Sequence, residues 1–259
     1  ARKKVIKAGK VEQLDLKGLR EDRRAIFPSG LAILYGIFEQ LSIDQMEVSG
    51  GALREGLLYD LLGRFAHEDV RERSIQSLMS RHHVERTQAE RVCDTATGLY
   101  GQVAKSWQLD DGELADTLRW GALLHEVGLA VSHSQFHKHG AYLVTNSDLP
   151  GFSRQEQQAV AVLVRGHRRK LPLSALLELP DDEQQGLLRL CLVLRLSARL
   201  HHARCDEVIP EMVLKAEDNT LSLQFPAHWL EEHPLTLADL EQEQDYFRAG
   251  GYELRLVDN

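Results

Sequence analysis

Apolar residues recur at helical spacing along most of the chain. From His67 to Leu200 they follow the i, i+3, i+4 pattern of amphipathic helices with few interruptions. The clearest examples are Val92, Ala96, Leu99 and Val103, then Leu114, Leu118, Ala122 and Leu123, and then Val160 to Val164. Asp148-Leu149-Pro150-Gly151 marks a junction, and Ser153 with Glu156 predicts a capping box at the start of the next helix. The pattern therefore predicts a mainly α-helical fold.

The pattern changes after Asp206, where short alternating runs replace helical spacing. A hairpin, a helix and a final strand are expected, which together form a small α+β module. The segments are Val213-Leu214 and Leu221–Phe225 around the turn Glu217-Asp218-Asn219, the helix Leu235–Phe247 and the strand Tyr252–Val257.

An apolar helix, Leu31–Leu41, and a strand-like run, Gln45–Val48, come before the helical region. The strand-like run ends at Ser49, Gly50 and Gly51, and a helix is expected over Ala52–Phe65. Glycines let a phosphate approach the backbone, and the free amides and dipole of a helix start attract an anion. Arg54 would add a side-chain donor. Ser49, Gly50, Gly51 and Arg54 are thus candidate phosphate ligands, although ordinary strand-to-helix packing gives the same pattern.

The charge is unevenly distributed. The 259 residues carry a formal net charge of −8, but residues 1–30 contain nine basic residues against four acids. A second basic cluster consists of Arg165, His167, Arg168, Arg169 and Lys170. Basic patches on an acidic protein indicate a polyanionic ligand held at defined places. Solvated charges on surface helices are the alternative interpretation.

The cysteines and the apolar runs indicate a reducing, cytoplasmic location. The three cysteines lie in or beside helical patterns, which is typical of small buried apolar groups and not of a disulfide framework. No secretory signal is visible, and the apolar run near Leu187 is too short for a membrane span and is interrupted by Arg189 and Arg195.

The segment Trp120–Val144 concentrates residues that can hold a metal or activate water. Metal-dependent phosphohydrolases of the HD type place adjacent His and acid residues on a buried helix, with a histidine upstream and an acid downstream. The candidates are the pair His125-Glu126, the upstream His82 or His83, and the nearby His133, His137 and His139. The downstream position reads Leu196-Ser197-Ala198 and supplies no carboxylate. An HD-like helical domain is expected, with a metal site that has decayed.

The ordered motifs FPSGLAILYGIF, SGGALREGLLYDL, LLHEVGLAVSHSQFHKHGAYLVTNSDLPGF and LVRGHRRK resemble the exopolyphosphatase and guanosine-pentaphosphate phosphatase family over essentially the whole chain. The resemblance implies three parts. Residues 1–65 would be the last strand-helix part of an actin-like (ribonuclease H-like) lobe. Residues 66–206 would be the HD-like domain, and residues 207–259 the small α+β module.

The resemblance also implies a mechanism. In this family a glutamate and Mg²⁺ act between two actin-like lobes, and that machinery would precede residue 1. This chain is therefore expected to be the C-terminal part of an exopolyphosphatase, inactive alone, with no catalytic residue, no metal ligand and no cofactor of its own. The small C-terminal module favours polyphosphate over guanosine pentaphosphate by analogy alone.

Three functional hypotheses remain. The first is a module that binds polyphosphate and supports a homodimer. In it, His137 or His139 and the subset of the basic cluster that faces one way, at most three residues, line a route for polyphosphate; Arg165 and Arg169 are spaced for one helix face. The second is an HD-type metal hydrolase, and the third is an inert dimerisation domain. The expected partners are inorganic polyphosphate, a second copy and the N-terminal catalytic half. Nucleic acid is not expected, and peripheral membrane association stays open.

Overall fold

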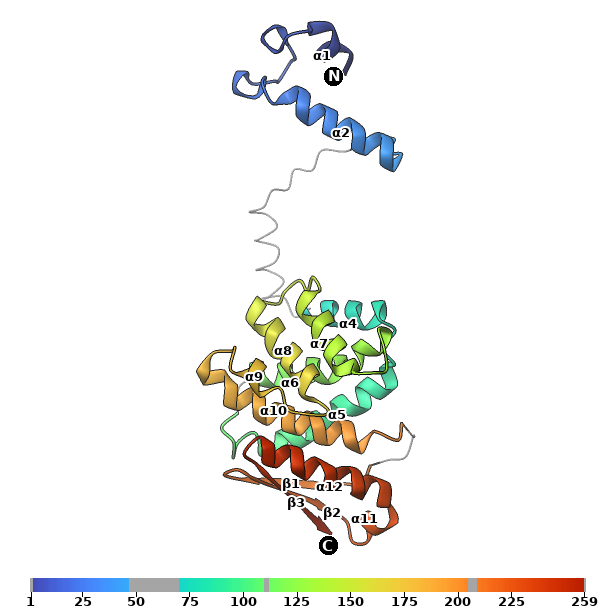
Figure 1. The fold of residues 1–259 in the computed structure, drawn as a ribbon, viewed down its shortest axis with the longest axis vertical. Helices are drawn as coiled ribbons and strands as arrows, with labels where there is room; N and C mark the ends of the chain where they lie inside the picture. Colours follow the sequence, from blue (N-terminus) through green and yellow to red (C-terminus); the bar gives the residue numbers. More distant parts are fainter. Residues whose placement is uncertain (1, 47–69, 110–111, 205–208, 259) are drawn as a thin grey trace. The chain divides into compact units, whose positions relative to one another are not determined.

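Figure 1 shows the computed structural model, which describes residues 2–46, 70–109, 112–204 and 209–258. The chain divides into two compact units, Ala1–Leu57 and Leu58–Asn259. The predicted boundaries after residues 65 and 206 both fall outside the described residues. The division into 1–65, 66–206 and 207–259 therefore stays a prediction.

Short helices make up the described part of the first unit. They are α1 (Arg2–Ala8), the 3₁₀ turns η1 (Val11–Gln13) and η2 (Glu21–Arg23), and α2 (Phe27–Leu41). α2 confirms the predicted apolar helix and begins earlier than expected, with Pro28 in its first turn, where the missing N–H costs no hydrogen bond. Ser42 ends α2 in the left-handed conformation, with φ of 51°. α2 buries none of its residues.

The predicted phosphate-binding turn follows α2. Gln45 and Met46, the first residues of the expected strand, have no regular secondary structure. The remaining predicted features, namely the end of that strand, Ser49, Gly50, Gly51, Arg54 and the helix Ala52–Phe65, lie outside the described residues.

A helical bundle forms most of the second unit and confirms the mainly α-helical prediction. Its helices are α4 (Val70–Arg81), α5 (Arg86–Val103), α6 (Gly112–Leu124), α7 (Phe136–Asn146), α8 (Arg154–Gly166), α9 (Leu173–Leu176) and α10 (Asp181–Leu200), with the 3₁₀ turn η3 (Val127–Ala130) between α6 and α7. α10 contacts α5, α6 and α8, and between Leu187 and Leu200 it is mostly apolar and mostly buried. It is the central helix of this core.

Helix starts and close helix contacts follow from particular residues. The Ser153 side chain accepts from the Glu156 backbone N–H, and the Glu156 carboxylate accepts from the Ser153 N–H, which confirms the predicted capping box of α8. At the other end of α8, a Cβ on Gly166 would lie 2.7 Å from the Cys191 Sγ. Glycine therefore lets α8 approach α10 closely.

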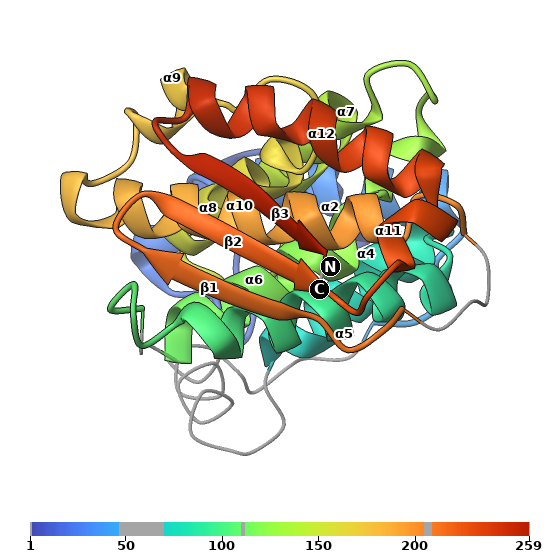
Figure 2. The same ribbon diagram turned by 90° about the horizontal axis from the view of Figure 1, so that it is seen from below.

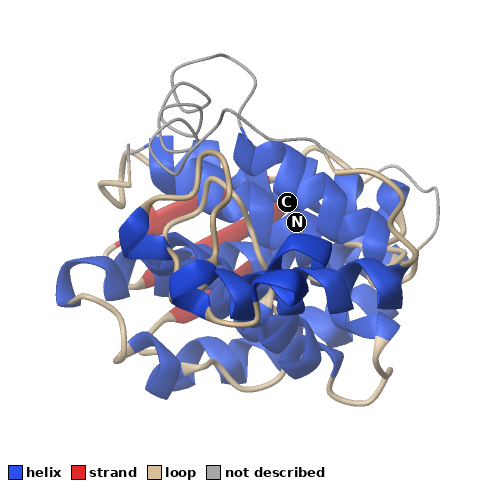
Figure 3. Ribbon diagram, turned by 90° about the horizontal axis from the view of Figure 1, so that it is seen from above, coloured by secondary structure: helices blue, strands red, loops and turns tan. Residues whose placement is uncertain are grey.

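Three strands and two helices follow the bundle. They are β1 (Val213–Glu217), β2 (Thr220–Phe225), α11 (Trp229–Glu232), α12 (Pro234–Ala249) and β3 (Glu253–Asp258). β1 and β2 form the predicted hairpin, and β3 pairs with β2 in parallel, with Leu221 opposite Leu254. Figure 2 shows α12 beside the sheet, and in Figure 3 these strands are the only red elements among the described residues. Alternate residues of β2 are buried, so one sheet face packs on the helices.

A buried ion pair joins α12 to α10. The Arg195 Nε donates to the Glu243 Oε2 at 2.7 Å, and both side chains are fully buried. The Arg195 Nη1 donates to the Gly166 carbonyl at 2.7 Å, and the Arg199 Nε donates to the Glu243 Oε1 at 2.8 Å. One carboxylate thus pairs with two arginines and offsets their buried charge.

Candidate functional site

A cavity of about 320 Å³ opens in the second unit where the ends of several helices meet. Its walls come from the start of α5, the segment between α6 and α7, the residues after α8 and the end of α10. The lining residues are Gln88, His125, Glu126, Leu129, His133, Phe136, His167, Arg168, Ala198, Arg199, His202 and Arg204. We call this cavity the histidine–arginine pocket.

Two buried histidines lie side by side in this pocket. His125 follows α6 and His167 follows α8, and their rings are 5.3 Å apart between centroids and nearly perpendicular, at 86°. The His125 Nδ1 is 2.6 Å from the Ala122 carbonyl oxygen, and the His167 Nδ1 is 2.7 Å from the Val164 carbonyl oxygen. A carbonyl oxygen only accepts, so each Nδ1 carries a hydrogen. In the neutral ring the Nε2 is then left as an acceptor.

Burial keeps both rings neutral. It lowers the pKa of His125, and it lowers the pKa of His167 well below the ordinary histidine value. The neighbouring His125 ring lowers the pKa of His167 further. Both histidines therefore present lone pairs, not positive charges, at neutral pH.

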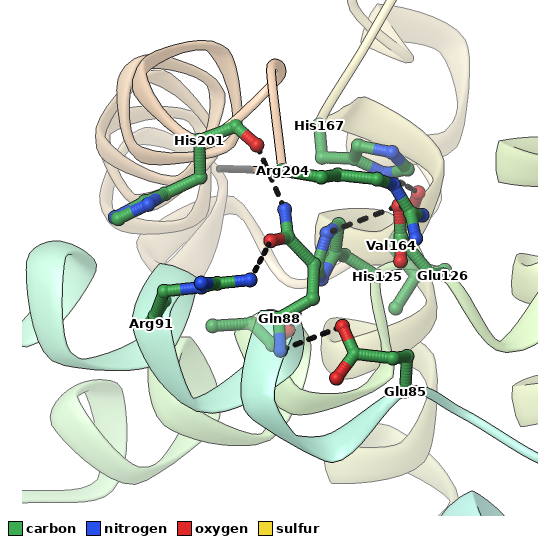
Figure 4. A network of polar contacts seen from close by, with 10 residues as sticks. Glu85, Gln88, Arg91, His125, Glu126, Val164, His167, His201 and Arg204 are labelled. Atoms are coloured by element: carbon green, nitrogen blue, oxygen red, sulfur yellow. Dashed lines mark hydrogen bonds and ion pairs between the residues drawn. The ribbon is translucent and has the colours of Figure 1, made fainter. Parts of the chain in front are cut away.

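Glu126 and Arg204 form an ion pair at the same place (Figure 4). The Arg204 Nη2 donates to the Glu126 Oε1, while the His125 Nε2 lies 3.9 Å from that oxygen, beyond hydrogen-bond distance. The carboxylate that would complete an HD-type ligand pair is thus already bound to a guanidinium.

Two further arginines line the pocket. The Arg168 guanidinium lies 4.5 Å from the centroid of the Phe136 ring, and within the described ranges no carboxylate forms an ion pair with it. Arg199 is bound on its far side by Glu243 and Asp239 of α12. Since Arg199 and Arg204 are paired with carboxylates, Arg168 is the lining arginine that forms no ion pair within the described ranges. The pocket therefore favours an anion.

The basic cluster does not act as one surface. α8 ends at Gly166, and Arg169 has a left-handed backbone with φ of 59°. The interpretation that Arg165 and Arg169 share one helix face is wrong, because the helix ends between them. Arg165 lines a separate cavity of about 240 Å³ beside Glu178, whereas Arg168 lines the histidine–arginine pocket. Arg169 and Lys170 are exposed and line neither cavity.

His137 and His139 of α7 have different surroundings. His137 is buried beside His167, 6.4 Å between ring centroids, and its Nδ1 has no hydrogen-bond partner in the described part of the chain. Burial, with smaller effects from Arg165 and Arg168, lowers the pKa of His137 to about 4. Neither His137 nor the half-buried His139 lines the pocket.

The structure places other residues where an HD-type site was expected. Neither His82 nor His83 lines the pocket, and Gln88 occupies that wall. The Gln88 Nε2 donates to the His201 carbonyl at 2.9 Å, as Figure 4 shows. The buried Ser197 hydroxyl donates to the Val193 carbonyl of its own helix. In the ranges that the structure describes, no group of three or more His, Cys, Asp or Glu side chains could hold a metal ion.

Comparison with known proteins decides the family. The model of Ppx/GppA phosphatase domain III matches residues 70–244, and the model of the Ppx/GppA phosphatase family matches residues 2–65. The chain belongs to the Ppx/GppA phosphatase family. The resemblance inferred from the motifs is therefore confirmed, and the histidine–arginine pocket lies within domain III of this family.

Two curated relatives carry the same name. A protein of Pseudoalteromonas translucida (strain TAC 125) is 39% identical over 246 residues, which are 94% of this chain and 49% of that protein. A protein of Aeromonas hydrophila subsp. hydrophila is 37% identical over 253 residues, which are 98% of this chain and 51% of that protein. Both are named guanosine-5′-triphosphate,3′-diphosphate pyrophosphatase. The chain spans about half the length of the curated relatives it matches.

No helix within the described ranges combines the length and the apolar character that crossing a bilayer needs.

Proposed function

We propose that this chain is part of a hydrolase that cleaves phosphoanhydride bonds in guanosine 5′-triphosphate 3′-diphosphate. The observation that carries the proposal is the name of both relatives, which are 39% and 37% identical over nearly the whole chain. The family assignment and the basic lining of the histidine–arginine pocket also support a phosphorylated substrate.

Polyphosphate is the second candidate substrate. The small C-terminal module favours polyphosphate by analogy alone. The family name covers exopolyphosphatases and guanosine-pentaphosphate phosphatases. The names of the relatives favour the guanosine substrate. A pocket with three arginines on its lining suits either polyanion, so charge alone does not separate them.

The role we propose for this chain is to bind and position substrate. We expect the hydrolytic glutamate and the Mg²⁺ ligands in an N-terminal catalytic half. Mg²⁺ would supply charge stabilisation for the phosphates there. Association into a homodimer and a cytoplasmic location are further parts of this proposal.

The test compares two substrates on the full-length protein and on this chain. We expect phosphate release by the full-length protein with a kcat/KM at least about tenfold higher for guanosine 5′-triphosphate 3′-diphosphate than for the ends of long-chain polyphosphate, a difference of about 1.4 kcal/mol. This chain alone should release no phosphate from either substrate. A preference for polyphosphate would replace the proposed substrate, and phosphate release by the isolated chain would refute the division of roles.

A further inference from the structure

The two histidines of the histidine–arginine pocket offer acceptors that nothing in the described part of the chain uses. The His167 Nε2 is buried and has no hydrogen-bond partner there. The His125 Nε2 lies 3.9 Å from the Glu126 Oε1. That oxygen is itself an acceptor, so it offers no hydrogen to this nitrogen. A buried polar atom without a partner costs free energy, so a ligand or a water molecule that donates hydrogen bonds would stabilise this arrangement.

The kind of donor follows from the lining. The two imidazole nitrogens and the Glu126 carboxylate are all acceptors, and they lie beside arginines. An ionised polyphosphate chain offers acceptors only, so it could meet the arginines and not the imidazoles. Guanine presents adjacent N–H groups on one edge, whereas adenine presents one amino group beside an acceptor nitrogen.

We propose that the histidine–arginine pocket is a guanine nucleotide site, in which His125, His167 and Glu126 accept hydrogen bonds from the base and Arg168 binds a phosphate. The proposal rests on the proposed function and names the place where the nucleoside end of the substrate binds. The cavity of about 320 Å³ lies within the usual range for small-molecule sites, roughly 300 to 1,000 Å³. Arg168 is suited to the phosphate because its guanidinium forms no ion pair with a carboxylate of the described residues.

The test measures binding of three probes to this chain by calorimetry at low salt. GDP should bind, ADP should bind at least about fivefold more weakly, and tripolyphosphate should bind at least about tenfold more weakly, because each hydrogen bond to a buried acceptor contributes a factor of roughly 3 to 10. Tripolyphosphate carries the charge without the base, so it separates recognition of the nucleoside from simple attraction to arginine.

Two variants locate the site and a third is the control. His167→Asn places an amide N–H near the position of the Nδ1, so the bond to the Val164 carbonyl is kept and the Nε2 acceptor is lost. We expect it to weaken GDP binding about tenfold and to leave tripolyphosphate unchanged. Arg168→Gln should weaken both probes. Arg169→Gln removes the same charge from an exposed neighbour that does not line the pocket, and it should change neither.

The outcomes separate this inference from the proposed function. Three results would each overturn the guanine site and leave a pocket filled by water. They are equal affinity for GDP and tripolyphosphate, GDP binding that is unchanged in both pocket variants, and no GDP binding at millimolar concentration. If His167→Asn does not fold, Arg168→Gln against Arg169→Gln decides the location. If full-length protein with Arg168→Gln hydrolyses the guanosine substrate with an unchanged KM, the guanine site is refuted and the proposed function stands. Failure to hydrolyse it refutes the function, whatever the isolated chain binds.

Discussion

Replacement of Glu243 by glutamine tests whether one buried carboxylate holds α12 on the helical bundle. Glu243 is fully buried and accepts from Arg195 of α10 at 2.7 Å and from Arg199 at 2.8 Å. Glutamine has the same shape but no charge. Arg195 is fully buried and forms no ion pair with any other carboxylate in the described ranges, so the variant leaves an uncompensated charge in the core.

The expected cost follows from that uncompensated charge. Removal of one member of a buried ion pair costs about 3 to 5 kcal/mol, because the partner stays buried without its counter-charge. Arg199 loses less, since the Asp239 Oδ1 remains 3.7 Å from its Nη1. For a domain of this size each kcal/mol lowers the melting temperature by about 2 to 4 °C, so Glu243→Gln should lower it by roughly 6 to 20 °C.

Thermal and urea unfolding followed by circular dichroism measure the effect. Glu241→Gln is the matched control, because Glu241 is exposed on the same helix, and it should change the unfolding free energy by less than about 0.5 kcal/mol. A loss below about 1 kcal/mol in Glu243→Gln would refute the reasoning. It would mean that water reaches Arg195 or that the two arginines find other partners.

Two further predictions concern stability. Gly128→Ala should lower the free energy of unfolding in urea by about 1 to 3 kcal/mol or more, because the new Cβ would lie 2.0 Å from the Phe136 carbonyl oxygen. The control Gly98→Ala, on an open helix surface, should be neutral or stabilising. Equal effects of the two variants would contradict this account. The pKa of His137 and that of His201 are both lowered to about 4, mainly by burial, so the unfolded chain binds more protons than the folded one between about pH 6.5 and 4. The stability that the two neutral histidines contribute is therefore present above pH 6.5 and is lost as the pH falls. The midpoint of urea unfolding should drop between pH 7.5 and 5, and an unchanged midpoint would contradict this prediction.

Local sequence signals predict most of the helices and the start of α8. The capping box at Ser153 and Glu156 is present because both partners lie within one turn and need no tertiary contact. The hairpin of β1 and β2 is present for the same reason, since its turn joins strands that pair with each other. Signals of this kind depend only on neighbouring residues.

The histidine–arginine pocket could be predicted only in part. His125, Glu126 and His167 were recognised as candidates, but Gln88, Arg199 and Arg204 were not. Arg204 lies just after α10, and its position against Glu126, 78 residues earlier, depends on how α10 packs. The spacing of Arg165 and Arg169 predicts one shared helix face, because the sequence does not show that α8 ends at Gly166, between them.

The pair of Glu126 and Arg204 explains why the histidine–arginine pocket lacks the free carboxylate of the predicted HD-type metal site. A carboxylate beside a histidine would attract a divalent cation if it were free, but here a guanidinium occupies it. Where the sequence predicts the second acid of an HD-type site, the chain has Ser197, whose hydroxyl donates to the Val193 carbonyl of its own helix. With one acid neutralised and the other absent, Arg168 sets the sign of the local field. This positive field is what the proposed binding of substrate phosphates at the histidine–arginine pocket requires.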